Sequence, residues 1–297
     1  MVRVMRVLCR DGELLFGCEV EIGDRYVNVY IRRTKRTYRI DLNSITDLTY
    51  EELSGKLLAT LVSGRIIEIQ PQVTEDRDVV SKVLVYFTLL KNPSNIDHIN
   101  QVLKAFSSSI DAVLRLTSAL HETWYGIDWR KIMESTEAVA ETIRLSEDLW
   151  ANLDKEDLYR LLDSVSRRDI RGVLGSAKNV IASLCYSARL SLSQVLPGTS
   201  PEVLLDVTLA AILSYALGTL KVSISERELL SLEEVISSSI KRFGKVMNID
   251  ESILKELEAD LRSTQSTEKI VSNIVNVLRR SYQDIIESSR EAPRRVE

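Results

Sequence analysis

Histidine and cysteine, the residue types most often used for metal binding and for redox or acid–base chemistry, are scarce in this chain. Its 297 residues include two histidines, His98 and His121, and three cysteines, Cys9, Cys18 and Cys185. An odd number of cysteines without a CxxC pair argues against a disulfide framework and favours a reducing compartment. We expect small buried side chains at these positions, although Cys9 and Cys18 fall on adjacent predicted strands and could face each other.

Few residue patterns in the chain suit bond-breaking chemistry. The histidines lie on one predicted helix, about 35 Å apart at a rise of 1.5 Å per residue, too far to share a metal ion. The glycine-containing run from Gly172 to Lys178 lies inside a helical pattern without a preceding strand, so it does not form a phosphate-binding loop. By elimination we expect no catalytic residues, no metal and no cofactor. The alternative is an enzyme whose site is dispersed along the chain.

Glycine and proline are also few, at 11 and 5 residues, and aliphatic and charged residues are abundant, which hints at a heat-adapted organism. The length fits two domains, and 44% hydrophobic residues suffice for a sizeable core. Residues 1–91 carry a net charge of +1 and the remainder −5, which together give the formal −4. Neither part is as basic as a dedicated nucleic-acid-binding domain.

Only one long segment, residues 203–220, is apolar almost all round. Asp206 lies near its start and Ser214, Tyr215 and Thr219 interrupt it, without a cationic flank. These features favour a central helix of a helical bundle, with a membrane span as the alternative. The first residues alternate charged and apolar side chains and lack the apolar region of a signal peptide, so we expect a cytoplasmic protein without a transmembrane segment.

The hydrophobic pattern changes from period 2 to about 3.6 near Asp78, which divides the chain into two domains. Before that point, alternating β-branched and aromatic residues predict seven strands, and Pro71 ends the last one. The predicted strands are residues 2–10, 13–22, 25–32, 37–42, 44–48, 56–62 and 65–70. An amphipathic helix is predicted at 78–91. We expect an α+β protein whose first domain, 1–91, is a seven-stranded antiparallel β-barrel or sandwich capped by that helix.

This layout resembles the pleckstrin-homology (PH) superfold. The run Ile40-Asp41-Leu42-Asn43-Ser44-Ile45-Thr46-Asp47-Leu48 is similar to the mid-domain strand pair of that superfold. The same run resembles the archaeal taxis adaptor family CheF, over about ninety residues. That resemblance implies a pleckstrin-like N-terminal region and an adaptor that links a phosphorylated response regulator to the motility motor without catalysis. The helical half lacks the rest of the family pattern, so no functional residue carries over.

A basic cluster is the main candidate binding site in the first domain. It comprises Arg32, Arg33, Lys35, Arg36 and Arg39, with no acidic residue between positions 25 and 39. These cations flank a predicted hairpin tip, where they could bind phosphate or carboxylate groups. The alternative is a solvated loop whose charges protect a sheet edge from aggregation.

The rest of the chain predicts helices. They are expected at residues 94–122, 130–150, 154–163, 168–196, 200–220, 225–242, 250–262 and 267–289. Ser225 and Glu228 form a capping box at the start of one of them. We expect an irregular all-α helical bundle of seven or so helices as the second domain, 94–290, followed by a frayed tail at 291–297.

Two modules without evident chemistry are typical of an adaptor, so the main expectation is a cytoplasmic scaffold that binds protein partners. The resemblance makes a response regulator the specific partner. The alternative is a peripheral protein that binds anionic membranes or nucleic acid through the basic cluster, although the charge balance gives no strong nucleic-acid signal.

Overall fold

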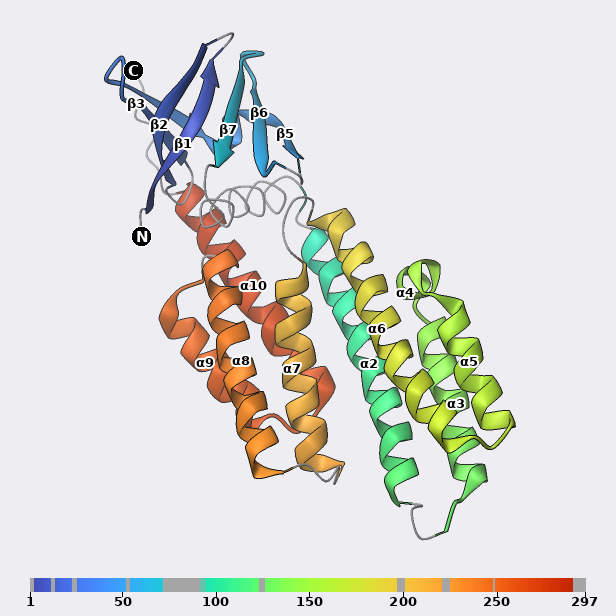
Figure 1. Ribbon diagram of the computed structural model, residues 1–297. Coiled ribbons are helices and arrows are strands. Elements are labelled where there is room, and N and C mark those ends of the chain that lie inside the picture. Colours follow the sequence, from blue (N-terminus) through green and yellow to red (C-terminus); the bar gives the residue numbers. More distant parts are fainter. Residues whose placement is uncertain are drawn as a thin grey trace.

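The chain folds into an antiparallel sheet followed by a helical region, in a computed structural model (Figure 1). The structure describes residues 3–11, 14–22, 26–51, 54–71, 92, 94–122, 126–196, 201–220, 225–247 and 249–290. The predicted capping helix at 78–91 and the predicted tail at 291–297 lie outside these ranges. The domain boundaries at 91 and 94 therefore stay predictions.

The predicted seven strands are confirmed, with ends that differ from the prediction by at most three residues. They are β1 (Arg3–Asp11), β2 (Leu14–Ile22), β3 (Tyr26–Ile31), β4 (Arg36–Asp41), β5 (Ile45–Glu51), β6 (Lys56–Leu61) and β7 (Ile66–Pro71). A short 3-10 turn, η1 (Leu42–Ser44), joins β4 to β5. All neighbours pair antiparallel in the order β4-β3-β2-β1-β7-β6-β5. The expected barrel is corrected on one point: the sheet is not closed, because β4 and β5 remain its two edges.

Strict alternation of apolar and polar residues gives the sheet one buried face. In β3, Val27, Val29 and Ile31 are buried while the residues between them are only half-buried. The sheet is strongly curled. This curl is visible in one contact: the Arg65 guanidinium, in the turn between β6 and β7, lies over the ring of Tyr38 on the edge strand β4. As a result the inner face encloses one core. Its buried members are Cys9, Cys18, Val20, Val27, Val29, Ile40, Ile45, Leu57, Ala59, Ile67 and Ile69.

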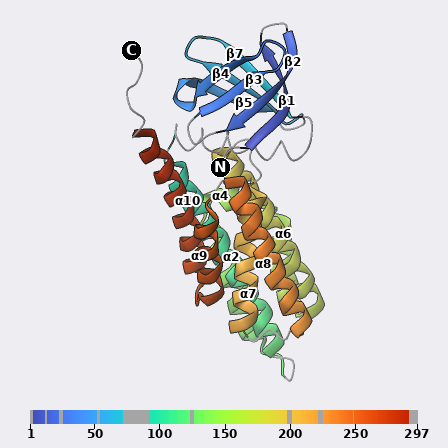
Figure 2. The ribbon, with the colours of Figure 1, turned by 90° about the vertical axis from the view of Figure 1, so that its left-hand side faces the viewer.

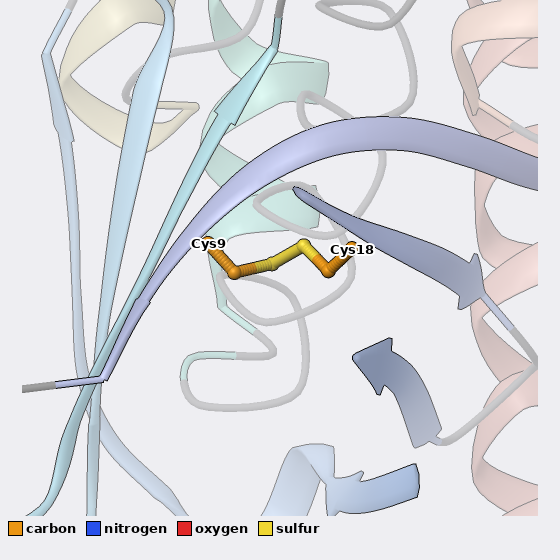
Figure 3. Close-up of a disulfide and its surroundings, with 2 residues drawn as sticks. All are labelled: Cys9 and Cys18. Atoms are coloured by element: carbon orange, nitrogen blue, oxygen red, sulfur yellow. A yellow bond between two sulfur atoms is a disulfide. The ribbon is translucent and has the colours of Figure 1, made fainter. Parts of the chain in front are cut away.

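The expectation of reduced cysteines in the sheet is wrong. Cys9 on β1 and Cys18 on β2 form a disulfide within this core, with a Cα–Cα distance of 6.0 Å (Figure 3). They are not directly opposite, since Cys9 pairs with Phe16 and Cys18 with Val7. The bridge therefore joins diagonal neighbours on the inner face. Cys185 is a free thiol in the helical region.

The described helical region contains nine helices. They are α2 (Asn95–Glu122), α3 (Trp129–Arg144), α4 (Glu147–Asn152), α5 (Lys155–Ser166), α6 (Ile170–Val195), α7 (Glu202–Thr219), α8 (Glu226–Met247), α9 (Glu251–Ser263) and α10 (Thr267–Arg290). The helix predicted at 130–150 is in fact two helices, which is a correction. Ser146 leaves the helical conformation and its hydroxyl accepts the Leu149 N–H, so it starts α4 as an N-cap.

Helix α2 is the centre of the bundle. It contacts α3, α4, α6, α7 and α10, and Figure 2 shows it running between the other long helices below the sheet. Three polar side chains on α2 donate hydrogen bonds to carbonyls near the ends of other helices. Asn95 bonds the Val195 carbonyl, Ser107 that of Thr267 and Ser118 that of Leu220. Because terminal carbonyls have no partner within their own helix, these bonds fix where α6 and α7 end against α2.

Helix α7 is the apolar segment noted in the sequence. It packs against α2, α6, α8, α9 and α10, and half of its residues are buried. Among the described residues it is the one helix long and apolar enough to cross a membrane, a test that core helices also pass.

The next helix, α8, begins with the predicted capping box, which is confirmed. The Glu228 carboxylate accepts the Ser225 N–H at 2.8 Å, and this bond network lowers the pKa of Glu228.

Alanine substitutions at two helical glycines should change the free energy of unfolding in opposite directions. A Cβ on Gly175 would meet open space, whereas a Cβ on Gly244 would overlap the Leu254 side chain of α9. Gly175→Ala should therefore raise the free energy of unfolding by about 0.5–1 kcal/mol through lower backbone entropy of the unfolded chain. Gly244→Ala should lower it by about 1–3 kcal/mol because α8 and α9 must move apart. Urea denaturation followed by circular dichroism measures both, and equal effects would contradict this packing.

The disulfide determines how many thiols the protein should expose and contributes to the stability of the sheet. Unreduced protein in denaturant should expose one thiol per chain, and reduced protein should expose three. Replacing both Cys9 and Cys18 with alanine should lower the free energy of unfolding of the sheet by about 2–3 kcal/mol, the loop-closure value for a bridge that spans this short a loop. Thiol titration and denaturation of the sheet measure these values. Three thiols in the unreduced protein would contradict the bridge.

Candidate basic binding site

The candidate site lies at the hairpin between β3 and β4. Ile31 pairs with Arg36, and residues 32–35 form the turn between them. All five cations predicted as a binding site are exposed, but the structure does not bring them together as one cluster. Strand alternation sends them to different faces of the sheet.

Two of the five, Arg32 and Arg39, are held on the outer face of the sheet. Arg32 forms an ion pair with Glu19 on β2. The Arg39 guanidinium stacks over the ring of Tyr26, 4.1 Å from its centroid. Glu21 lies on the same face and accepts a hydrogen bond from Asn28. These contacts make the outer face charge-balanced, so Arg32 and Arg39 add little to an anion site.

The other three cations, Arg33, Lys35 and Arg36, are here called the basic tip. In the described part of the chain no carboxylate lies within ion-pair distance of any of them. Three adjacent positive charges without counter-ions create a positive potential at the tip. Arginine and lysine donors at this spacing suit a compact anion such as a carboxylate pair or a phosphoryl group.

Lys35 has a backbone conformation that a lysine rarely adopts. Its φ of 56° lies in the left-handed region, where a side chain with a Cβ costs about 1 kcal/mol relative to glycine. Turns of this kind usually place glycine or asparagine at such a position. The turn thus holds a charged side chain at the tip at a small backbone cost.

Arg65, in the turn between β6 and β7, reaches β4, and the sequence gives no local sign of this contact. Its guanidinium carbon lies 4.6 Å from the centroid of the Tyr38 ring. Tyr38 is two residues from Arg36 on the same face of β4, roughly 7 Å along the strand. The curl of the sheet thus brings a cation from the β6–β7 turn towards the basic tip. The alternating patterns of two successive strands predict a turn between them. They do not predict which distant strand that turn approaches.

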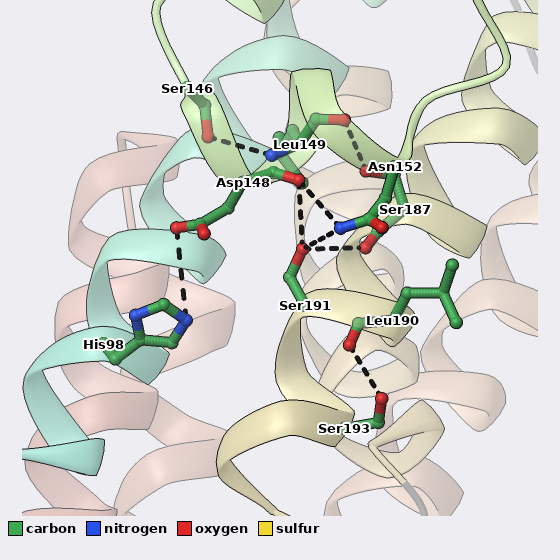
Figure 4. Close-up of polar contacts among 9 residues, drawn as sticks. All are labelled: His98, Ser146, Asp148, Leu149, Asn152, Ser187, Leu190, Ser191 and Ser193. Carbon is green, nitrogen blue, oxygen red and sulfur yellow. Dashed lines mark hydrogen bonds and ion pairs between the residues drawn. The ribbon is translucent and has the colours of Figure 1, made fainter.

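The two histidines lie on α2, as predicted, and they are not near each other. His98 Nε2 is 4.0 Å from an Asp148 carboxylate oxygen on α4 (Figure 4). Ser187 and Ser191 on α6 lie near this pair, but their hydroxyls donate to the carbonyls of Leu149, Asp148 and Ser187. These bonds tie α4 to α6. Among the described residues, the His98 Nε2 atom accepts no hydrogen bond from either serine hydroxyl.

Within the residues that the structure describes, no group of three metal-binding side chains is close enough to hold an ion. No protein-family model, no curated protein and no solved structure matches this chain.

Cys185 on α6 is chemically inert for a thiol. Burial and the nearby Asp206 carboxylate raise its pKa to about 11. Burial also raises the pKa of Asp206, while the Arg242 guanidinium, 3.5 Å away, opposes that rise. Because the thiolate is the reactive form, the raised pKa makes Cys185 a weak nucleophile at neutral pH.

This pKa predicts slow alkylation. At pH 8, iodoacetamide should modify Cys185 in the folded protein about a hundredfold more slowly than an unperturbed thiol, since the thiolate fraction falls tenfold per pH unit below the pKa. Asp206→Asn should increase the rate, because it removes one cause of the raised pKa and leaves burial in place. Mass spectrometry of timed samples measures both rates. Rapid labelling of the folded wild type would contradict this assignment.

Proposed function

We propose that this protein is a non-catalytic adaptor that binds an acidic protein partner through the basic tip of the β3–β4 hairpin. The observation that carries the proposal is three exposed cations, Arg33, Lys35 and Arg36, without a carboxylate within ion-pair distance among the described residues. Exposed charges that are not neutralised within their own chain steer and orient a partner of opposite charge.

The surroundings of the basic tip favour a protein over a membrane or a nucleic acid. The outer face of the sheet is charge-balanced, because Glu19 pairs with Arg32, and so it adds no positive surface to the three cations of the tip. The whole chain has a formal charge of −4. Membrane surfaces and duplex nucleic acid are held by larger basic patches, because each cation adds only about 1 kcal/mol. A compact acidic patch or a phosphoryl group can contact the tip alone.

The proposal includes a pleckstrin-like fold for the first domain, with the helix predicted at 78–91 as its cap. The linear order of seven antiparallel strands, the strong curl and the single enclosed core support this part of the proposal. The resemblance to the CheF family makes a phosphorylated response regulator the specific partner, in archaeal taxis. A phosphoryl group offers the oxygen acceptors that arginine side chains bind in pairs.

The proposed location is the cytoplasm. The Cys9–Cys18 bridge fits that location if the organism is a hyperthermophile, since intracellular proteins of such organisms commonly contain disulfides. Low glycine and proline content points in the same direction.

The test is a charge reversal at the basic tip. The full chain with Arg33→Glu, Lys35→Glu and Arg36→Glu should bind a response regulator encoded by the same genome at least about tenfold more weakly than the wild type. Isothermal titration calorimetry with the phosphorylated and unphosphorylated regulator measures the affinities. Circular dichroism confirms that the variant is folded.

The matched control reverses three exposed cations of the helical region, Arg171, Lys178 and Arg227. Each reversal removes two units of charge, so both variants change the formal charge from −4 to −10. The control should bind within about twofold of the wild type, because only local charge matters at short range. An equal loss in both variants would show an effect of net charge and would contradict the proposed site.

Two further measurements separate the alternatives. Carbodiimide joins lysine amines to carboxylates, so crosslinks from Lys35 to acidic peptides of the regulator support the proposal. Salt-dependent binding to vesicles with about 30 mol % phosphatidylserine, or to duplex DNA, that disappears with the tip reversal would favour the membrane or nucleic-acid alternative instead.

A further inference from the structure

Side chains of α3 and α5 line a groove. These two helices lie on the part of the helical region far from α8 and α9 (Figure 1). The groove encloses about 410 Å³ and is lined by Glu137, Ala140, Glu141, Arg144, Leu145 and Leu162. Ala140 and Leu162 make part of the lining apolar, and Glu137 and Glu141 form an acidic edge. The groove belongs to the α-helical region and is separate from the basic tip.

Leu145 is the most exposed large apolar side chain in the described part of the chain, at 81%. It is the C-cap residue of α3, and its N–H donates to the Glu141 carbonyl at 3.1 Å, so its backbone is fixed. Leu145 therefore places an aliphatic side chain in solvent beside the groove, where a bound partner would cover it.

The acidic edge of the groove lacks counter-ions. Glu137 and Glu141 are one turn apart on α3, and in the described residues no cation lies within ion-pair distance of either. Glu134 on the same helix is paired with Arg130, which shows that a neighbouring glutamate does find its cation. Two like charges at this spacing destabilise a helix slightly unless a cation lies between them.

The arginine in the groove does not supply that cation. The Arg144 guanidinium lies over the ring of Trp150, 5.6 Å from its centroid, and Lys155 lies 5.1 Å from the same ring. Both cations are therefore engaged at the junction of α3, α4 and α5. The acidic edge remains available to a cation from outside the chain.

Four residues spaced four apart form one stripe along α3: Met133, Glu137, Glu141 and Leu145. Met133 is 50% exposed. The stripe thus has an apolar side chain at each end and two unpaired carboxylates in its middle. We propose that this stripe and the groove beside it, here called the acidic groove, bind an amphipathic helix of a partner protein. That helix would carry aliphatic, basic, basic and aliphatic side chains at the same four-residue spacing.

Charge complementarity selects this occupant. Rows of residues four apart are inclined to the helix axis, so a partner helix that crosses α3 at about −50° aligns its row with that of α3. It can then place its two cations against Glu137 and Glu141 and its end residues towards Met133 and Leu145. A second copy using the same face would bring four carboxylates together, which costs free energy. The acidic groove extends the proposed adaptor function, since a basic partner here differs from the acidic partner at the basic tip.

The probe for this test is a fluorescein-labelled alanine-based peptide of about 16 residues with Leu, Lys, Lys and Leu at positions i, i+4, i+8 and i+12. Fluorescence polarisation with the full-length protein should show saturable binding that weakens as salt rises. The combined Glu137→Gln and Glu141→Gln variant should bind about tenfold more weakly, and Leu145→Ser about threefold to tenfold more weakly.

Matched controls come from α8, where Glu226, Glu234 and Leu230 are also exposed. Glu226→Gln with Glu234→Gln removes the same two charges, and Leu230→Ser makes the same apolar change. Both should bind the probe like the wild type. Equal losses in the groove and control variants, or no loss in the groove variants, would overturn the proposal.

Two more results complete the test. The basic-tip reversal should leave probe affinity unchanged, and the groove variants should leave the Lys35 crosslinks of the proposed function unchanged. Either function can therefore fail without the other. Sedimentation that shows self-association lost in the groove variants would also overturn the proposal, because it would make a second copy the occupant.

Discussion

Burial of the apolar side of α2 is the constraint on which the helical region depends. Phe106, Ile110, Val113 and Leu116 on this helix are fully buried, and α2 touches five other helices. Burying such side chains contributes about 1.5–3 kcal/mol each before the loss of entropy is counted. Without α2 the faces of α6, α7 and α10 that pack on it would be exposed to water. The polar side chains of α2 that bond carbonyls near the ends of α6 and α7 then fix the positions of these neighbours.

The sheet and the helical region have separate hydrophobic cores, and their exposed charges differ in sign at the two proposed surfaces. The basic tip offers unneutralised cations, whereas the acidic groove offers unpaired carboxylates between two aliphatic side chains. Surfaces of opposite charge reject each other's partners as well as attracting their own. The two proposed surfaces would in this way keep two binding events distinct.

Local periodicity was sufficient to predict most of the architecture. Alternation along residues such as Val27, Val29 and Ile31 gave the strands, and the capping box of Ser225 and Glu228 gave the start of α8. The errors concern properties set by distant parts of the chain or by one residue. Strand pairing decides that the sheet stays open, and diagonal register on β1 and β2 places two cysteines at bonding distance. A single serine at position 146 interrupts a continuous apolar pattern. For the candidate site, the sequence identified the five cations. The ion pair and ring stacking that remove Arg32 and Arg39, and the approach of Arg65, required the three-dimensional register.

The partnership between α2 and α10 has a consequence for biosynthesis. These helices pack together although they lie at opposite ends of the helical region, and Ser107 bonds a carbonyl 160 residues later. During translation, α2 leaves the ribosome long before α10 exists, so part of its apolar surface has no native cover for most of synthesis. The sheet, whose strands follow one another with short turns, meets no such delay. The nascent chain would thus carry a folded amino-terminal sheet ahead of a helical region that stays incomplete until α10 has been made. Chaperones would be needed during that interval, because the apolar surface of α2 is then exposed.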